Sequence, residues 1–353
     1  MEEPSMKQGS ESEPASARLT ARAAEGVAPP VSMAGQNASG TAEAAISREA
    51  PAIETRQLVK RFGKTPALQG LDLRVPRGAV YALLGRNGAG KSTLMQLLLG
   101  LLEPSAGSVR VLGLDPIRDG IALRQRIGYI PERLPMYDWM TVEQTVRLVA
   151  DLHRGWDREE EVRLLARFKL PLKRKIRELS RGNRALLALT LAMAHSPELV
   201  LLDECTSGMD PVFRRDFDRS VIDALHESGR TVLFASHQVR ELERICDWVG
   251  IISEGKMLIE TPVEDLRASV KMLRVILQHG ALEDLPIQNV LERRRAGREW
   301  LITVSKYDPL IDRRCLQAGA HVAEVIDLNL EEIFIALLSD EWLLNDETED
   351  GGR

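Results

Sequence analysis

The sequence predicts an α/β fold followed by a small α+β appendage, and three observations support this prediction. Short apolar runs, typical of strands buried on both faces of a parallel sheet, alternate with helix-length segments through the middle of the chain. A glycine-rich motif that runs from Gly85 to Ser92 stands between a predicted strand at 80–84 and a predicted helix at 94–99. After residue 260 the alternation gives way to a second, shorter group of strands and helices.

Length and composition narrow the classes of protein that fit. The chain has 353 residues, which favours more than one domain, and 44% hydrophobic residues are enough for a sizeable core. The net charge of −5 gives no basic field for nucleic acid, so we expect no nucleic-acid partner. The three cysteines lack metal-ligand spacing and fit a reducing compartment. The longest apolar run, 185–194, is about half the length of a bilayer-spanning helix, and no signal-peptide pattern is present, so we expect a cytoplasmic protein.

The first domain is predicted to follow a disordered tail. Residues 1–51 contain no aromatic residue and are rich in Ala and Ser, too little apolar surface to offset the chain entropy. Residues 52–265 then carry the α/β pattern. The predicted strands lie at 71–75, 80–84, 199–202, 231–235 and 249–252, and helix-length segments at 142–153, 212–227 and 239–245.

The second domain is predicted to span residues 266–340. Its predicted strands lie at 272–277, 300–304 and 321–326, and its predicted helices at 309–318 and 330–338. Residues 341–353 form an acidic tail that we expect to fray.

The glycine-rich motif predicts a phosphate-binding loop. Its residues fit the pattern G-x-x-x-x-G-K-[ST], in which glycines let backbone N–H groups wrap around phosphate oxygens at a helix N-terminus. Lys91 then offers its ammonium group to the β- and γ-phosphates, and the Ser92 hydroxyl can ligate Mg²⁺. The predicted nucleotide-binding residues of this loop are Gly85, Arg86, Asn87, Gly88, Ala89, Gly90, Lys91, Ser92 and Thr93.

Two carboxylates complete the predicted site. Asp203 and Glu204 follow the apolar strand at 199–202, which places them at the carboxyl end of the sheet, where open α/β sheets bind ligands. Asp203 is the candidate Mg²⁺ ligand. Glu204 is the candidate general base that polarises the attacking water.

A further motif carries a family resemblance. The segment Leu179, Ser180, Arg181, Gly182 and Asn183 lies shortly before the strand at 199–202 and is similar to the L-S-G-G-Q signature of ABC transporter ATP-binding subunits. The resemblance covers about 53–260 and implies a P-loop NTPase fold of the ABC type, with a helical subdomain at about 133–190. It also implies that Ser180 and Gly182 contact the γ-phosphate of ATP bound by a second subunit.

Other motifs carry the same resemblance. The segment Ser207, Gly208, Met209 and Asp210 resembles the D-loop, and His237 stands at the place of the switch histidine that contacts the γ-phosphate. Phe62 stands at the place of the aromatic residue that stacks on adenine; a buried core role is the alternative. The segment 127–132 resembles the Q-loop, and Glu132 stands at the place of its glutamine, which implies a catalytic role and a contact with Mg²⁺.

Three departures from the family pattern affect these expectations. Glu132 replaces the usual glutamine, and because a carboxylate can still ligate Mg²⁺ we expect retained activity with altered metal dependence. Arg181 and Asn183 replace Gly and Gln in the signature. Cys205 replaces a proline and is interpreted as a small packing residue.

The resemblance implies an Mg²⁺-dependent ATPase that pairs with a second ATPase subunit and powers an integral membrane permease, most closely resembling exporters. It would then be peripheral on the cytoplasmic face of the plasma membrane. The alternative is a soluble ABC ATPase that remodels a ribosome, DNA or an assembly complex. That alternative is disfavoured because the chain has one signature, no heptad run and a negative net charge. The C-terminal appendage resembles exporter extensions, and both bracing and regulation of the dimer stay open as its role.

Aromatic residues are concentrated between Tyr129 and Trp156, directly after the Q-loop. Prolines interrupt this stretch, so we interpret it as an interaction loop in which Tyr137, Trp139 and Met140 dock the permease, with Tyr137 and Trp139 as the exposed pair. The alternative is that these side chains pack the helical subdomain. The basic run at 173–175, with Arg177, is interpreted as a solvated face; contact with anionic headgroups is the alternative.

Overall fold

The structure is a computed structural model. It describes residues 50–206, 217, 221, 229–239, 242–278, 285–297 and 299–349, with 340–349 described by their backbone alone. The tail expected at 1–51 lies outside the described residues except for Ala50 and Pro51, as does most of the helix expected at 212–227 and the end of the acidic tail at 350–353.

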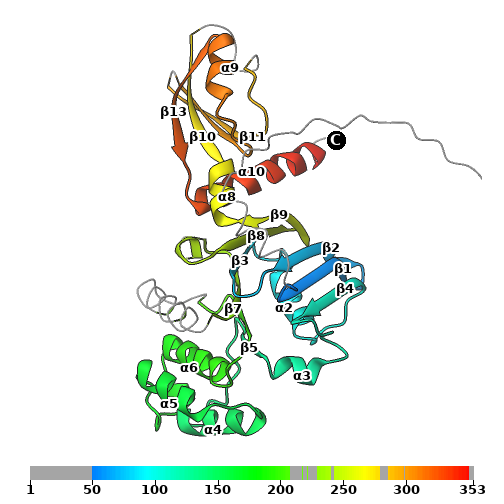
Figure 1. Ribbon diagram of the computed structural model, residues 1–353, viewed down its shortest axis with the longest axis vertical. Helices are drawn as coiled ribbons and strands as arrows, with labels where there is room; N and C mark the ends of the chain where they lie inside the picture. Colours follow the sequence, from blue (N-terminus) through cyan, green and yellow to red (C-terminus); the bar gives the residue numbers. More distant parts are fainter. Residues whose placement is uncertain are drawn as a thin grey trace, which may run out of the picture. The chain divides into compact units, whose positions relative to one another are not determined.

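A six-stranded sheet forms the centre of the α/β part of the chain, in the order β5-β6-β7-β3-β8-β9 (Figure 1). Its strands are β3 (Val80–Leu84), β5 (Ile127–Ile130), β6 (Leu199–Asp203), β7 (Thr231–Ser236), β8 (Trp248–Ser253) and β9 (Lys256–Pro262). All neighbours are parallel except β8 and β9. Alternate residues of β3 enter two different cores: Tyr81 and Leu83 one, Ala82 and Leu84 the other. Burial on both faces is why these strands appear as apolar runs in the sequence.

A second, antiparallel sheet has the order β2-β1-β4 and comprises β1 (Ile53–Phe62), β2 (Thr65–Val75) and β4 (Ala106–Val111). Helix α2 (Lys91–Leu98) contacts this sheet and β6 of the central sheet, and its buried leucines share one core with both. The short α3 (Gly120–Arg124) precedes β5. Because the phosphate-loop motif directly precedes α2, this packing fixes the loop against the central sheet.

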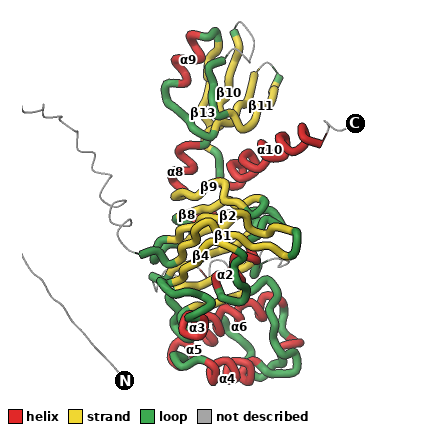
Figure 2. The backbone as a smooth tube through the Cα atoms, turned by 90° about the vertical axis from the view of Figure 1, so that its right-hand side faces the viewer, coloured by secondary structure: helices red, strands yellow, loops and turns green. Residues whose placement is uncertain are grey.

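A group of helices follows β5: α4 (Val142–Leu152), α5 (Arg158–Arg167), the short η1 (Ile176–Glu178) and α6 (Arg181–Met193), which lie together in Figure 2. Each α-helix begins at a residue whose side chain caps it. Thr141 and Gln144 form a capping box on α4, Asp157 caps α5, and Ser180 caps α6. The helix expected at 239–245 is represented by a single 3₁₀ turn, η2 (Leu242–Arg244), in the part of that segment that is described.

The C-terminal elements begin with α8 (Val263–Ser269). An antiparallel sheet follows in the order β11-β12-β10-β13, made of β10 (Lys271–Leu277), β11 (Val290–Ala296), β12 (Glu299–Val304) and β13 (Ala320–Asp327). This sheet and α9 (Ile311–Gln317) share a core of their own. The last helix, α10 (Leu330–Glu349), extends beyond the expected end at residue 338. Within the described residues, no helix combines the length and apolarity needed to span a bilayer.

Candidate functional site

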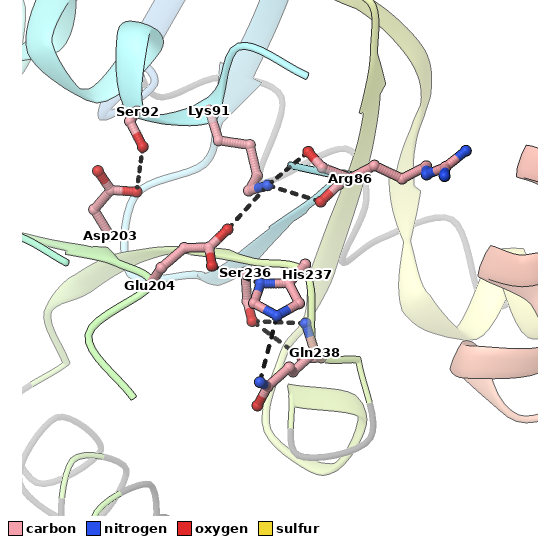
Figure 3. Close-up of polar contacts among 9 residues, drawn as sticks. Arg86, Lys91, Ser92, Asp203, Glu204, Ser236, His237 and Gln238 are labelled. Atoms are coloured by element: carbon pink, nitrogen blue, oxygen red, sulfur yellow. Dashed lines mark hydrogen bonds and ion pairs between the residues drawn. The ribbon is translucent and has the colours of Figure 1, made fainter. Parts of the chain in front are cut away.

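Three strand ends of the central sheet bring the predicted catalytic residues together. The order β6-β7-β3 makes these parallel strands neighbours, so their carboxyl ends lie at one edge. β3 leads into the phosphate loop and Lys91, β6 ends at Asp203 and Glu204, and β7 leads to His237. Figure 3 shows that these side chains converge in one place.

At two positions of the phosphate loop, the backbone leaves room only for glycine. A Cβ on Gly85 would lie 2.5 Å from the carbonyl oxygen of Ile252, and one on Gly90 would lie 2.7 Å from that of Ala67. Gly90 also has φ +108°, a conformation that L side chains rarely adopt, and it directly precedes the first residue of α2. The loop therefore presents its N–H groups at a helix N-terminus, as an anion cradle requires.

Lys91 is buried, with 4% of its side chain exposed, and its ammonium group has three oxygen partners. It donates to the carbonyl oxygens of Gly85 at 2.7 Å and Arg86 at 3.0 Å, and it lies 3.0 Å from Oε1 of Glu204 (Figure 3). A buried ammonium held this way is pre-positioned at the loop. Phosphate oxygens that enter the cradle would compete with Glu204 for this charge.

Asp203 is a buried carboxylate whose pKa is raised. It is 3% exposed, and its Oδ1 accepts a hydrogen bond of 3.2 Å from the Ser92 hydroxyl. Burial raises the pKa of Asp203 from 3.8 to about 6, and the negative charges of Glu204 and Glu132 add to this rise. Burial also raises the pKa of Tyr129 to about 12, assisted by the charge of Asp203. Tyr129 was not predicted from the sequence, since nothing in its own segment marks it as a neighbour of Asp203.

Glu204 has an unusual backbone conformation, with φ +46°. Its N–H donates to the carbonyl oxygen of Ala235 at 3.0 Å, which holds this turn against β7. A non-glycine residue in this region costs free energy and is often found at functional sites. The turn directs the carboxylate between two partners, Lys91 on one oxygen and Nδ1 of His237, 2.5 Å away, on the other.

Further predicted site residues that the structure describes belong to β1 and to the start of α6. Phe62, at the end of β1, is 51% exposed, which fits a stacking platform and excludes the alternative of a buried core residue. Ser180 caps α6, and its hydroxyl oxygen accepts from the N–H of Asn183 at 3.2 Å. Gly182 is buried in the first turn of α6. The predicted D-loop, Ser207–Asp210, lies outside the described residues.

The two charged departures from the family pattern, Glu132 and Arg181, share one pocket. Glu132, Arg133, Arg181 and Arg184 line it together with two leucines, and its volume is about 410 Å³. Arg184 is also paired with Asp138 at 3.1 Å. Glu132 therefore lines the same pocket as Arg181 and Arg184 of α6, a proximity that the separate motifs did not reveal.

Oxygen donors in this centre fit Mg²⁺. Among the described residues, no group of three or more His, Cys, Asp or Glu side chains is placed to hold a metal ion. Mg²⁺ with a nucleotide needs fewer protein ligands, because phosphates and water supply the others. The Ser92 hydroxyl and the Asp203 carboxylate, already in contact, are hard ligands of that kind.

The predicted docking loop is partly corrected by the structure. Tyr137 is 59% and Trp139 is 67% exposed, and their ring centroids lie 5.8 Å apart. Met140 is only 8% exposed, so its prediction as an accessible docking residue is wrong. Its carbonyl oxygen accepts from the N–H of Ile176, and this pairing with the neighbouring segment holds its side chain inside.

An apolar groove of about 510 Å³ begins at Tyr137 and runs along α4, where Leu148 also lines it. His153 and His195 lie in its wall with their rings stacked at 4.3 Å. Burial, followed by the charge of His153, lowers the pKa of His195 to about 4, so both rings are neutral near pH 7. Sequence analysis missed this pair because its members come from elements far apart in the chain.

Comparisons with known proteins identify a matching family model and several similar proteins. A family model described as "ABC transporter" matches residues 68–207. The ABC transporter ATP-binding protein YtrB of Bacillus subtilis is 29% identical over 80% of this chain and 97% of its own length. The daunorubicin resistance ATP-binding protein DrrA3 of Streptomyces coeruleorubidus is 32% identical over 80% of this chain and 94% of its own length. The solved structure of cbiO1 from Clostridium perfringens, part of the ABC transporter complex cbiONQ, has 26% identity and a TM-score of 0.56, and covers 62% of this chain and 92% of that one.

Proposed function

The chain belongs to the family of ABC transporter ATP-binding proteins and is an ATPase, and we propose that two such subunits power an exporter through ATP-driven closure. The observation that carries this proposal is the convergence of Lys91, Asp203, Glu204 and His237 at one edge of the central sheet. The named relatives are transporter ATP-binding proteins, so the alternative of a soluble remodelling ATPase is not favoured.

In the proposed mechanism the phosphate loop and Lys91 hold the β- and γ-phosphates. Ser92 and Asp203 would hold Mg²⁺, with Glu132 as a further oxygen donor. Mg²⁺, when bound, neutralises charge on the phosphate oxygens. Phe62 stacks on the base. The exposed ring of Phe62 and the buried position of Lys91 support these two roles.

Glu204 is the proposed general base. Its carboxylate is released from Lys91 when phosphate oxygens take over the ammonium group, and it then accepts a proton from the attacking water. Nδ1 of His237 lies 2.5 Å from Oε2 of Glu204, so His237 can orient this carboxylate. In the proposed mechanism, His237 also reaches the γ-phosphate. The contact supports a joint action of the two residues.

The second half of each site is proposed to come from the partner subunit. Ser180 and Gly182 lie at the N-terminus of α6, where the N–H groups and the helix dipole favour an anion. In this family the signature serves the nucleotide of the other subunit, and Ser207–Asp210 would cross the interface beside it. A twofold dimer of this chain, or a pair with a paralogue, would then hold two composite sites.

The membrane partner is proposed to be an integral membrane permease, which would keep this subunit on the cytoplasmic face of the plasma membrane. The groove at Tyr137 is the proposed docking site, because it is apolar, open and next to the segment of Glu132. Export is the proposed direction, which the similarity to DrrA3, a daunorubicin resistance protein, supports.

Complementation between two inactive variants tests the shared site. Ser180→Arg places a long side chain at the signature, and Lys91→Ala removes the phosphate-binding charge; each homodimer should be inactive. Mixed dimers combine one intact phosphate loop with one intact signature, so the mixture should regain ATP hydrolysis. A Ser180→Arg protein that hydrolyses ATP at the normal rate would show that the site is not shared.

Docking is tested with the permease present. Tyr137→Ala should weaken the complex by about 2 kcal/mol, as expected for an aromatic residue at an interface centre. ATP binding by the isolated subunit should not change. Leu316→Ala is a matched control, since Leu316 is 61% exposed but belongs to α9. Equal affinities of the Tyr137 variant and the wild type would place docking elsewhere.

A further inference from the structure

Two loops of the helical region lie side by side and are joined through their backbones. The N–H of Arg177 donates to the carbonyl oxygen of Asp138 at 3.2 Å, and that of Val142 donates to the carbonyl oxygen of Arg174 at 3.0 Å. Thr141 and Lys175 form an antiparallel bridge between these two contacts. The aromatic loop at 137–143 and the basic loop at 172–177, remote in sequence, therefore form one continuous surface.

This pairing sorts the side chains of the two loops into an inner and an outer set. Met140 and Ile176 point inward and are buried. Trp139, 67% exposed, and Leu172, 42% exposed, lie outside. Tyr137, Asp138 and Glu143 are exposed as well. We call the exposed cations, together with Trp139 and Leu172, the basic ridge, and its members are Trp139, Leu172, Lys173, Arg174, Lys175 and Arg177.

The acidic residues near the ridge do not cancel its charge. Asp138 is paired with Arg184 at 3.1 Å. Glu143 lies in the first turn of α4, where it complements the helix dipole, and Glu178 directly follows the basic loop. When Arg184 is counted with the ridge, cations outnumber carboxylates here, although the whole chain carries a net charge of −5.

The position of the ridge also connects it to the proposed permease site. The ring of Trp139 lies 5.8 Å from that of Tyr137, which lines the docking groove, whereas Trp139 itself does not line that groove. The two exposed aromatic residues thus belong to adjacent but separate surfaces. If the subunit docks on the permease through the groove, the ridge lies next to the contact between the two proteins.

We propose that the basic ridge binds the anionic surface of a lipid bilayer. Lysine and arginine side chains near such a surface contribute about 1 kcal/mol each, and tryptophan favours the boundary between headgroups and acyl chains. The exposed side chains of Trp139 and Leu172, together with the four cations of the ridge, are better suited to this boundary than to bulk water. The proposal rests on the proposed function, because a transporter ATPase works next to the membrane.

Vesicle binding by the purified full-length chain tests this proposal without any permease. The protein should co-sediment with vesicles rich in phosphatidylglycerol, less so at high salt, and not with vesicles of phosphatidylcholine alone. The triple variant Lys173→Gln/Arg174→Gln/Lys175→Gln should bind the anionic vesicles about 10²-fold more weakly, three charges at about 1 kcal/mol each. Trp139→Ala should also weaken binding.

A second basic segment of the chain provides a matched control. Arg293, Arg294 and Arg295 are exposed on β11, an edge strand of the C-terminal sheet. Replacing these three with Gln removes the same charge and should leave vesicle binding unchanged. ATP hydrolysis in solution, measured on every variant, separates loss of vesicle binding from loss of the fold.

Several results would overturn the proposal: no binding to anionic vesicles, equal binding to neutral ones, or an equal loss in the β11 variant. Binding only to vesicles that contain a permease would assign the ridge to the protein interface instead. None of these results would affect the complementation between Ser180→Arg and Lys91→Ala, so the proposed ATPase mechanism is judged separately.

Discussion

Replacing Asp203 with Asn should stabilise the protein while it abolishes its proposed Mg²⁺-dependent activity. Burial and the neighbouring carboxylates raise the pKa of Asp203 from 3.8 to about 6. At about 1.4 kcal/mol for each pKa unit, ionising this group costs the folded state about 3 kcal/mol more than the unfolded state. Asn keeps the shape and can accept from the Ser92 hydroxyl but carries no charge, so the variant should gain about 2–3 kcal/mol at pH 7.5.

The stability difference between Asp203→Asn and the wild type should grow as the pH rises. The folded state holds the proton of Asp203 more tightly than the unfolded state does. The free-energy cost of ionising Asp203 is therefore absent below the unfolded pKa of about 4 and complete above about pH 6. Urea unfolding of the nucleotide-free protein should show the full difference between Asp203→Asn and the wild type at pH 7.5 and about half of it at pH 5. An Asn variant no more stable than the wild type at pH 7.5 would refute this reasoning.

Three further predictions concern nucleotide binding and metal use. Lys91→Ala should weaken ATP binding itself, because the buried cation on the β- and γ-phosphates is lost, and unchanged affinity in a calorimetric titration would argue against the phosphate cradle. Phe62→Ala should weaken binding by about 1–3 kcal/mol if its exposed ring stacks on the base, and Phe62→Tyr should not; equal loss in both would exclude stacking. Glu132→Gln should keep ATP hydrolysis but require more Mg²⁺ for half-maximal rate, and a Mg²⁺ titration identical to the wild type would remove Glu132 from the metal site.

The sequence predicted the strand ends that build the site, because the determining signals are local. The apolar run at 199–202 and the acidic pair after it suffice to place Asp203 and Glu204 at the carboxyl edge of a parallel sheet.

Other features depend on tertiary contacts that no single segment shows. Glu204 has a positive φ at the point where its N–H donates to Ala235 on the neighbouring strand, and the stacking of His153 on His195 joins distant elements. Met140 seemed accessible because its loop is rich in apolar residues, yet the hydrogen bond from Ile176 turns it inward. The pairing of the aromatic and basic loops was hidden from sequence analysis for the same reason.

The role of Glu204 is the central claim, and Glu204→Gln tests it most directly. The glutamine keeps the size of the side chain and cannot accept a proton from water, so ATP should still bind while steady-state hydrolysis falls by about 10²-fold or more. With ATP and Mg²⁺ present, light scattering should then show a stable dimer of this variant, whereas the wild type should return to monomers as ATP is consumed. Hydrolysis at the wild-type rate by Glu204→Gln would contradict the account.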